Sequence, residues 1–337
     1  MTPRGTDWGL ATLVALLAFT GALTAFAGAP SRAWVFTLHG VAGLAVAGLL
    51  VWKLRRVWRR ARPGAGLLAA AVVALTLVSG IAWSSGADAA PAGFAVLAWH
   101  DALGAVLVAA VVAHAAVRAK RPRRRDLADR RQFLIAAGVG AAAYAAARLQ
   151  RRVGPGTHRR FTGSYERLSF AGNAFPTTSW IADHPRALDR HHYRLAVDGA
   201  VDRPLSLPLH DLAGGDELVA TLDCTGGFYS TQRWRGVRVA ALLDRAGARA
   251  DHVRVISHTG YRWSFAVEDA RDLLLATHVG GEALSHDHGA PVRLVAPGRR
   301  GFQWVKWVVR LELHDGPDPG AAASTVWSSL TPEGRGA

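Results

Sequence analysis

The sequence predicts a membrane α-helical bundle of four or five transmembrane helices, followed by an α+β domain. Three observations predict this fold class. Long apolar segments occupy the first 150 residues, basic residues cluster in two of the linkers between them, and the composition from Arg159 onward is typical of a soluble domain. Half of the 337 residues are hydrophobic, and a chain of this length is long enough for two domains.

Four of the apolar segments have the length of a membrane-spanning helix, which requires roughly 20 apolar residues. They show almost no polar face, whereas long helices of soluble proteins show one. A fifth segment is mildly apolar and rich in alanine and glycine. The five segments cover residues 8–27, 33–52, 65–83, 94–117 and 133–147.

The formal net charge of +15 is concentrated in two linkers, at residues 53–62 and 118–131, which together hold 14 lysines and arginines. Basic linkers between apolar helices are typical of cytoplasmic loops, so this charge indicates a lipid bilayer as the partner and not nucleic acid. The positive-inside rule places the N-terminus inside the cell. A fifth helix would carry everything after about Gly154 to the extracytoplasmic side of the cell membrane.

The fifth apolar segment starts Arg130-Arg131-Gln132-Phe133-Leu134 after Asp129, which resembles a twin-arginine export signal placed inside the chain. Two arginines before a helix also fit an ordinary basic loop. Twin-arginine export moves folded proteins, so this interpretation predicts a cofactor that is inserted before export. We expect the segment to remain as an uncleaved anchor.

Two helix pairs in the bundle have similar sequences, which indicates an internal duplication. Leu38-His39-Gly40 in the second segment matches Trp99-His100-Asp101 in the fourth, and each histidine has a glycine four residues later. The preceding helices match at Thr20-Gly21 and Ser79-Gly80. Packed about a pseudo-twofold axis, the two pairs would point both histidines at one central site.

His39 and His100, placed at one depth, suit the axial positions of one b-type haem near the outer face. Structural hydrogen bonds or a proton path are the alternatives for such histidines. His114 lies near the inner surface, where it either borders a quinone site or is merely interfacial. The pattern resembles four-helix membrane cytochrome b domains.

After Arg159 the chain alternates short β-rich runs with turn-rich stretches, so we predict an α+β domain with mixed sheets. We expect strands at residues 193–197, 218–222, 253–257, 292–295 and 304–313, and helices at 239–246 and near 267–274. The expected domains are a four-helix transmembrane domain at 1–120, a basic loop with the fifth helix at 121–155, a cofactor-binding domain at 156–316 and a flexible tail at 317–337.

Cys224 is the only cysteine, so the chain forms no intramolecular disulfide and no multi-cysteine metal site. It follows the expected strand 218–222 and precedes a glycine-rich turn, Thr225-Gly226-Gly227. Such a turn would expose the thiol at a strand terminus and let a bulky cofactor approach. An inert buried side chain and a nucleophile paired with a histidine both fit the same pattern.

Residues 220–229 (ATLDCTGGFY) resemble the molybdenum-ligand motif of the sulfite oxidase superfamily, which includes periplasmic methionine-sulfoxide reductase catalytic subunits. In that family the cysteine sulfur binds molybdenum beside the pterin dithiolene. The resemblance covers nearly all of residues 161–314. It implies a sulfite-oxidase-type molybdopterin domain in which Cys224 is the molybdenum ligand.

Further matches imply which residues hold the pterin. Residues 173–177 (NAFPT), 288–295 (HGAPVRLV) and 301–307 (GFQWVKW) are similar to three cofactor-binding segments of the family. An arginine fork suits the pterin phosphate. Taken singly, Arg293 and Lys306 also fit the charges of an exposed surface, and residues 286–288 also fit an incidental metal site. The cofactor contacts implied are Asn173, Pro176, Thr177, Cys224, Ser257, His288, Arg293, Trp304, Val305 and Lys306.

The substrate side of the site is less well defined by the family pattern. We find no match to the substrate-binding arginine set of sulfite oxidases, which puts sulfite itself in doubt. Tyr229 and Arg235 are the expected catalytic residues beside Cys224, because a tyrosine donates hydrogen bonds and an arginine attracts anions. Arg233 is a further candidate. A stacked tyrosine and solvent-facing arginines are the structural alternatives.

We therefore predict a membrane-bound, molybdopterin-dependent oxidoreductase that performs two-electron chemistry of the oxygen-atom-transfer type. Electrons would pass between the molybdenum site and quinone or quinol through the haem on His39 and His100. The expected substrates are small S-oxides, N-oxides or sulfite-like compounds, and reduction with quinol as donor is favoured. The alternatives are sulfite oxidation, a thiol hydrolase that uses Cys224, and a non-catalytic membrane sensor that retains the fold.

Overall fold

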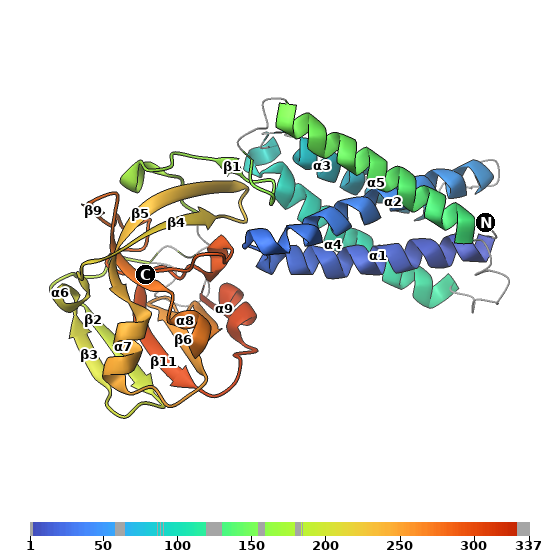
Figure 1. Ribbon diagram of the computed structural model, residues 1–337. Helices are drawn as coiled ribbons and strands as arrows, with labels where there is room; N and C mark the ends of the chain where they lie inside the picture. Colours follow the sequence, from blue (N-terminus) through green and yellow to red (C-terminus); the bar gives the residue numbers. More distant parts are fainter. Residues whose placement is uncertain are drawn as a thin grey trace. The chain divides into compact units, whose positions relative to one another are not determined.

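A computed structural model of the chain describes residues 3–57, 65–85, 87, 89, 91–118, 130–153, 159–178, 183 and 185–328. The chain divides into two compact units, Met1–Tyr165 and Glu166–Ala337. The first unit is built from helices, and the second is built mainly from strands (Figure 1).

Five long helices lie in the described part of the first unit, at the five segments that the sequence predicts. Three spans are long and apolar enough to cross a membrane, namely Pro3–Phe26, Pro30–Arg56 and Val96–Ala116. The apolar stretches Ala70–Ser85 and Phe133–Ala146 are shorter, so the number of membrane crossings stays a prediction. The helices are α1 (Pro3–Phe26), α2 (Ala33–Val57), α3 (Ala65–Ser85), α4 (Val96–Arg118) and α5 (Arg130–Val153).

Small residues let the backbones of these helices approach closely. Helix α2 lies against α1 and α5, and α3 lies against α4. A Cβ atom on Gly140 of α5 would be 3.1 Å from the backbone of Val41 and Ala45 in α2, and the ring of Tyr144 fills the space beside Gly40. The segment that resembles an export signal is thus packed on α2 through Gly140 and Tyr144, whereas Asp129 lies outside the described residues.

The stretch after α5 also belongs to the helical unit. Nη1 of Arg159 donates a hydrogen bond to the carbonyl oxygen of Trp83 (2.6 Å), and its guanidinium lies 3.4 Å from the ring centroid of Tyr165. Phe161 packs edge-on against Phe36, with centroids 5.6 Å apart. The helical unit therefore extends beyond residue 155, where the sequence places the boundary.

Two β-sheets form the second unit. One runs in the order β1-β5-β8-β10, with β4 on β5 and β9 on β8, and the other runs in the order β3-β2-β11-β6-β7. Strand β11 pairs in parallel with β2 and antiparallel with β6. The strands are β1 (Tyr165–Glu166), β2 (Arg194–Gly199), β3 (Leu205–Pro208), β4 (Asp216–Asp223), β5 (Phe228–Arg238), β6 (His252–Ser257), β7 (Arg262–Ala266), β8 (Leu274–Val279), β9 (Glu282–Ala283), β10 (Arg293–Val295) and β11 (Val308–His314).

Local sequence patterns explain the helices of this unit. Helix α7 (Val239–Ala246) buries Val239, Leu242, Leu243 and Ala246, which share one face at helical spacing. It ends at Gly247, whose φ of 68° is the left-handed conformation that favours glycine at a helix end. The other helices are α6 (Leu209–Leu212), α8 (Val267–Ala270) and α9 (Ala321–Ser328).

The structure corrects three predictions from the sequence. The helix expected near 267–274 is one turn long, and Leu274 begins β8, because a short, fully buried apolar run fits a strand as well as a helix. The strand expected at 304–313 begins only at Val308, since Trp307 has a left-handed φ of 50°. Part of the expected flexible tail is ordered, because α9 packs against β7.

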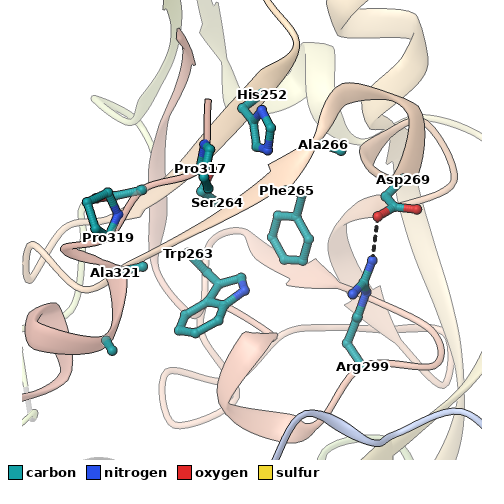
Figure 2. A pocket seen from close by; sticks show the side chains of 12 residues that line it. His252, Trp263, Ser264, Phe265, Ala266, Asp269, Arg299, Pro317, Pro319 and Ala321 are labelled. Carbon is teal, nitrogen blue, oxygen red and sulfur yellow. Dashed lines mark hydrogen bonds and ion pairs between the residues drawn. The ribbon is translucent and has the colours of Figure 1, made fainter. Parts of the chain in front are cut away.

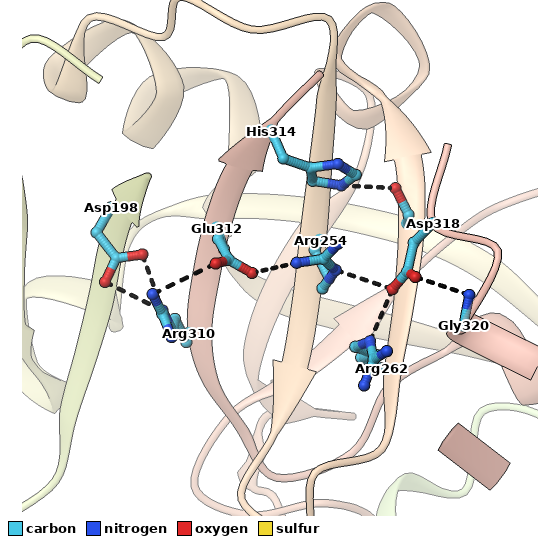
Figure 3. Close-up of polar contacts among 9 residues, drawn as sticks. Asp198, Arg254, Arg262, Arg310, Glu312, His314, Asp318 and Gly320 are labelled. Carbon is cyan, nitrogen blue, oxygen red and sulfur yellow. Dashed lines mark hydrogen bonds and ion pairs between the residues drawn. The ribbon is translucent and has the colours of Figure 1, made fainter. Parts of the chain in front are cut away.

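A ladder of charged side chains fastens the segment after β11 to the second sheet (Figure 3). Asp318 accepts hydrogen bonds from Nε of Arg254 (2.8 Å), from Nε of Arg262 (2.7 Å) and from the N–H of Gly320 (2.9 Å). Its side chain is only 5 % exposed. The ladder continues across the sheet through Glu312, Arg310 and Asp198.

We expect Asp318→Asn to lower the stability of the second unit by about 1–3 kcal/mol at neutral pH, because it weakens charged hydrogen bonds. Burial alone would raise the pKa of Asp318, but the bonds from Arg262 and Gly320 and the nearby arginine charges lower it. A depressed pKa in the folded state stabilises the protein above the unfolded pKa of about 3.9, and this stabilisation is lost as the pH falls through the folded value.

Thermal unfolding of the detergent-solubilised chain between pH 7 and pH 2 measures this effect. The difference in stability between wild type and Asp318→Asn should narrow as the pH falls. Asp315→Asn, which changes an exposed neighbouring carboxylate, is the control and should shift stability by less than about 0.5 kcal/mol. A stability difference that stays constant down to pH 2 would contradict the lowered pKa of Asp318.

Candidate functional site

Cys224 lies at the turn that joins β4 to β5. Its N–H donates to the carbonyl oxygen of Phe228 (2.8 Å), and the N–H of Gly227 donates to the carbonyl oxygen of Cys224 (3.1 Å). Gly227 has a φ of 98°, which favours glycine at this position. The turn thus holds the sulfur at a strand terminus, and the residue is buried, with 6 % of its surface exposed.

Two groups lie within hydrogen-bond distance of the Cys224 sulfur. Oγ1 of Thr178 is 3.1 Å from Sγ, and the backbone nitrogen of Gly226 is 3.3 Å from it. Thr178 follows directly on the predicted cofactor loop 173–177, so the structure brings this loop to the cysteine. The residue that makes the contact is one position beyond those that the sequence indicates.

Arg293 provides a buried positive charge near the cysteine. Its guanidinium lies 5.1 Å from the ring centroid of Trp234 and 5.8 Å from that of Trp304, and Nη1 donates to the carbonyl oxygen of His288 (3.0 Å). Burial lowers the pKa of Arg293 to about 10, and the nearby Cys224 opposes this shift. Its buried Nε has no hydrogen-bond partner among the described residues. Such a cation is suited to bind an anion.

Lys306 adds a second positive charge from another chain segment. Its Nζ donates to the carbonyl oxygen of Thr178 (2.9 Å). Burial and the charge of Arg293 lower the pKa of Lys306 to about 8, so the amine is mainly charged at neutral pH. Gly289 lets the two cations approach, since a Cβ there would lie 3.0 Å from Cβ of Lys306 and 3.1 Å from Cβ of Arg293.

His288 and Asn173 join the loops around the site. Nε2 of His288 lies 2.9 Å from the carbonyl oxygen of Phe175, and its Nδ1 lies 2.7 Å from Oγ of Ser285. Burial lowers the pKa of His288 to about 4, so the ring is neutral at pH 7. Asn173 donates to the carbonyl oxygen of Ala283 (2.9 Å) and accepts from the N–H of Ser285 (2.9 Å). Both side chains therefore organise the site through contacts within the protein.

The remaining predicted cofactor residues lie on neighbouring segments. Ser257 is buried at the end of β6, and its hydroxyl lies 3.2 Å from that of Thr259 in the following turn. Trp304 and Val305 are buried, and the carbonyl oxygen of Val305 accepts a hydrogen bond from Leu294 beside Arg293. Pro176 is half-buried and Thr177 is exposed. The metal site considered at residues 286–288 has no set of three ligands in the described part of the chain.

The two predicted catalytic residues lie at opposite ends of the β4–β5 hairpin. Tyr229 pairs with Asp223, next to the cysteine turn. Arg235 pairs with Glu217, six residues further along β5, which is about 20 Å away at the usual rise per residue of a strand. Arg233 is exposed on the same stretch of strand. The strand register therefore places Tyr229 beside the cysteine turn, and Arg233 and Arg235 further along the same strand.

A buried ion pair supports the cysteine turn. Nη1 of Arg300 lies 2.6 Å from Oδ1 of Asp223, and the two side chains are 4 % and 1 % exposed. The backbones of the two residues also form an isolated parallel bridge. Sequence reasoning missed this pair and Thr178. The position of Asp223 directly before Cys224 was the one available signal, because an acidic residue at a buried strand end needs a cationic partner.

Two of the cavities among the described residues of the second unit lie away from the predicted site residues. One of about 370 Å³ lies beside β7, where Trp263 and Phe265 form a wall and the Asp269–Arg299 ion pair (2.7 Å) lies at one end (Figure 2). The other, of about 410 Å³, is lined in part by Arg190, His210 and His278. The candidate site is therefore defined by buried charges and hydrogen bonds around Cys224.

In the helical unit, His39 and His100 face each other. Their ring centroids are 6.1 Å apart, and their planes meet at 84°. Nδ1 of His39 lies 2.9 Å from Oγ1 of Thr20, and Nδ1 of His100 lies 3.3 Å from Oγ of Ser79 and 3.0 Å from the carbonyl oxygen of Thr76. The matched sequences thus give the two rings matched hydrogen bonds.

Glycines of the preceding helices complete this symmetry. A Cβ on Gly21 would be 3.4 Å from Cε1 of His39, and a Cβ on Gly80 would be 2.8 Å from Cε1 of His100. Each ring therefore packs against a glycine, as the repeat Thr20-Gly21 and Ser79-Gly80 indicates. The side chain of His114 is exposed on α4.

Comparison with known proteins bears on the second unit. Residues 182–322 match the model of a family described as oxidoreductase molybdopterin binding domain. Mitochondrial sulfite oxidase from Mus musculus is 35% identical over 163 residues, which is 38% of this chain and 30% of that protein. Nitrate reductase 1 (NADH) from Nicotiana tabacum is 30% identical over 158 residues, or 35% of this chain and 18% of that protein.

The chain covers less than a third of the length of either relative. A solved structure of the sulfane dehydrogenase SoxCD from Paracoccus pantotrophus shares 30% identity and covers 39% of this chain and 40% of that chain. Its TM-score is 0.37. The second unit nonetheless contains a molybdopterin-binding oxidoreductase domain with sulfite oxidase and nitrate reductase homologues.

We expect Arg300→Met to destabilise the second unit by about 3–5 kcal/mol, because it leaves Asp223 buried without its guanidinium partner. The double variant Asp223→Asn/Arg300→Met should be less destabilised, since it removes both charges. Denaturant unfolding of the full chain, followed by tryptophan fluorescence, measures these differences.

Arg299→Met is the matched control for this pair. Arg299 pairs with Asp269 at 2.7 Å, but the two side chains are 29 % and 57 % exposed. Loss of such a surface pair costs about 1 kcal/mol or less. Equal losses in Arg299→Met and Arg300→Met would rule out a special role for the buried pair.

Proposed function

We propose that this chain is a membrane-anchored, molybdopterin-dependent oxidoreductase that performs two-electron chemistry of the oxygen-atom-transfer type. In this proposal the second unit lies on the extracytoplasmic side, and a haem b in the helical unit exchanges electrons with the quinone pool. The observation that carries the proposal is the convergence of Cys224, Arg293 and Lys306 within a domain that matches the molybdopterin-binding family.

The groups around Cys224 fit an anionic molybdenum–pterin cofactor. Thiolate is a soft ligand, and Cys224 is the only thiol in the chain. Arg293 is a buried cation whose Nε has no hydrogen-bond partner in the described part of the chain, and a guanidinium fork suits a phosphate. When bound, the cofactor supplies a metal that accepts and donates two electrons. We propose cofactor contacts from Asn173, Pro176, Thr177, Ser257, His288, Arg293, Trp304, Val305 and Lys306.

The chain's own residues hold and orient this cofactor. Arg293 and Lys306 offset its negative charge, and the β4–β5 turn fixes the sulfur. Tyr229 is placed at the same turn, where its phenol could donate a hydrogen bond to a substrate oxygen. An S-oxide substrate would take up two electrons and two protons and leave as a sulfide and water.

His39 and His100 would hold one haem iron between their rings, and the haem would supply one-electron transfer. A metal–imidazole bond is about 2.0–2.1 Å, so two rings that shared one metal would have centroids about 6 Å apart. The observed centroid distance is 6.1 Å. Both rings use Nδ1 for their hydrogen bonds, which favours the tautomer whose Nε2 binds a metal.

In this proposal electrons flow from the membrane to the molybdenum site, where they reduce the substrate. Quinol would release two electrons and two protons at the membrane, and S-oxides or N-oxides would accept them. This resembles the catalytic and membrane subunits of a methionine-sulfoxide reductase joined in one chain. The second candidate is sulfite oxidation, in which sulfite and water give sulfate, two electrons and two protons. The 35% identity to mouse sulfite oxidase favours it.

Replacing Cys224 tests the molybdenum site. We expect wild-type protein purified from cells that make the cofactor to contain about one molybdenum per chain, and Cys224→Ser to lose at least 90 % of the turnover of S-oxides. Elemental analysis and the substrate-dependent reoxidation of the reduced haem measure this. Thr221→Val, on the same strand, is the control. Full activity of Cys224→Ser, or purified wild-type protein that contains no molybdenum, would favour a non-catalytic sensor. Rapid alkylation of Cys224 in the native protein would favour a thiol hydrolase.

Replacing the paired histidines tests the haem. We expect reducible b-type absorption bands in the detergent-solubilised chain, with one haem per polypeptide. His39→Ala and His100→Ala should each remove most of this absorption, because a b-type haem loses an axial ligand. His114→Ala is the control and should keep the spectrum. Identical spectra in all four proteins would exclude His39 and His100 as the ligands.

A further inference from the structure

The hydroxyl of Thr178 lies within hydrogen-bond distance of the sulfur of Cys224. We propose that Thr178 is a positioning residue that donates a hydrogen bond to this sulfur and thereby raises the reduction potential of the metal that the sulfur binds. The inference rests on the proposed function. It adds a residue that acts on the metal through its ligand, outside the set that the sequence indicates.

The contact is between an exposed threonine and a buried sulfur. Oγ1 of Thr178 lies 3.1 Å from Sγ of Cys224, across 46 positions of sequence. The N–H of Gly226 reaches the same sulfur at 3.3 Å, but this donor belongs to the backbone of the turn. Thr178 is therefore the one contact to the sulfur, among the described residues, that a side-chain substitution can remove.

The direction of the hydrogen bond follows from the state of the sulfur. In a free thiol, either the S–H or the O–H could donate. A metal-bound thiolate carries no proton, so it can only accept, and the hydroxyl of Thr178 must donate. A donor withdraws electron density from the sulfur and so favours the reduced metal. Hydrogen bonds to ligand sulfurs set the potentials of other thiolate-bound metals in the same way.

Lys306 holds Thr178 in this position. Its Nζ donates to the carbonyl oxygen of Thr178 at 2.9 Å, across 128 positions of sequence. The ammonium also lies 5.3 Å from the ring centroid of Trp307, which limits its freedom. The carbonyl group of Thr178 is thus held by Lys306 while its hydroxyl contacts the sulfur. A hydroxyl fixed in this way needs little reordering to make its bond.

A redox titration of the full chain tests the proposal. The Mo(V) electron paramagnetic resonance signal would be recorded against potential for wild type, Thr178→Val, Thr178→Ser and Thr221→Val, after molybdenum analysis of each. Thr178→Val keeps the shape and removes the hydroxyl, and we expect the equilibrium constant for reducing the metal to fall on the order of tenfold. Thr178→Ser should stay close to wild type. Thr221→Val is the matched control, because it removes a hydroxyl bonded at 2.8 Å to Thr231, away from the sulfur.

Each outcome decides the proposal. A lower potential in Thr178→Val alone supports it. Unchanged potentials in a molybdenum-loaded Thr178→Val protein, or equal shifts in Thr178→Val and Thr178→Ser, would overturn this inference and leave the proposed function intact. Loss of the metal in Thr178→Val with retention in Thr178→Ser would assign the hydroxyl to metal retention, which also overturns it. Wild type without molybdenum would overturn the inference and the proposed function together.

Discussion

The ion pair between Asp223 and Arg300 determines where the cysteine sulfur can lie. Asp223 precedes Cys224, and Gly301 follows Arg300, so the pair brings two distant segments together at the turn. A Cβ on Gly301 would be 3.0 Å from Cα of Cys224, which shows how closely the segments approach. A buried pair of this kind adds little net stability compared with an apolar core, but the loss of either partner is costly. The pair is best understood as a constraint on position.

The rest of the site is built by polar side chains that join one loop to another. Asn173 and His288 connect the loop at 173–175 to the segment 283–288, and Lys306 connects Thr178 to the segment after Gln303. Each of these residues was selected from the sequence as a cofactor contact. In the structure, each of these side chains forms hydrogen bonds that hold two loops of the protein together. Groups that are ordered in this way bind a ligand with a smaller loss of entropy.

The helical unit uses the same principle with fewer groups. Each histidine is oriented by a hydroxyl at Nδ1 and a glycine against its ring, and the two sets repeat along the sequence. Fixing Nδ1 determines which nitrogen is left for a metal. Helix α5 packs closely on α2 beside His39, through Gly140 and Tyr144. The helix that resembles an export signal therefore packs on the same helix that carries His39.

The sequence by itself determined the five helices, the mixed α+β unit, the turn that carries Cys224 and the pairing of His39 with His100. These features depend on local apolar patterns, on glycines and on repeated motifs, which are readable along the chain. Only the tertiary structure decided that Thr178 and not its neighbour reaches the sulfur, that Arg300 pairs with Asp223, and that Arg235 lies at the far end of its strand. Such outcomes depend on strand register and on contacts between residues 46 to 128 positions apart, and no local pattern encodes them.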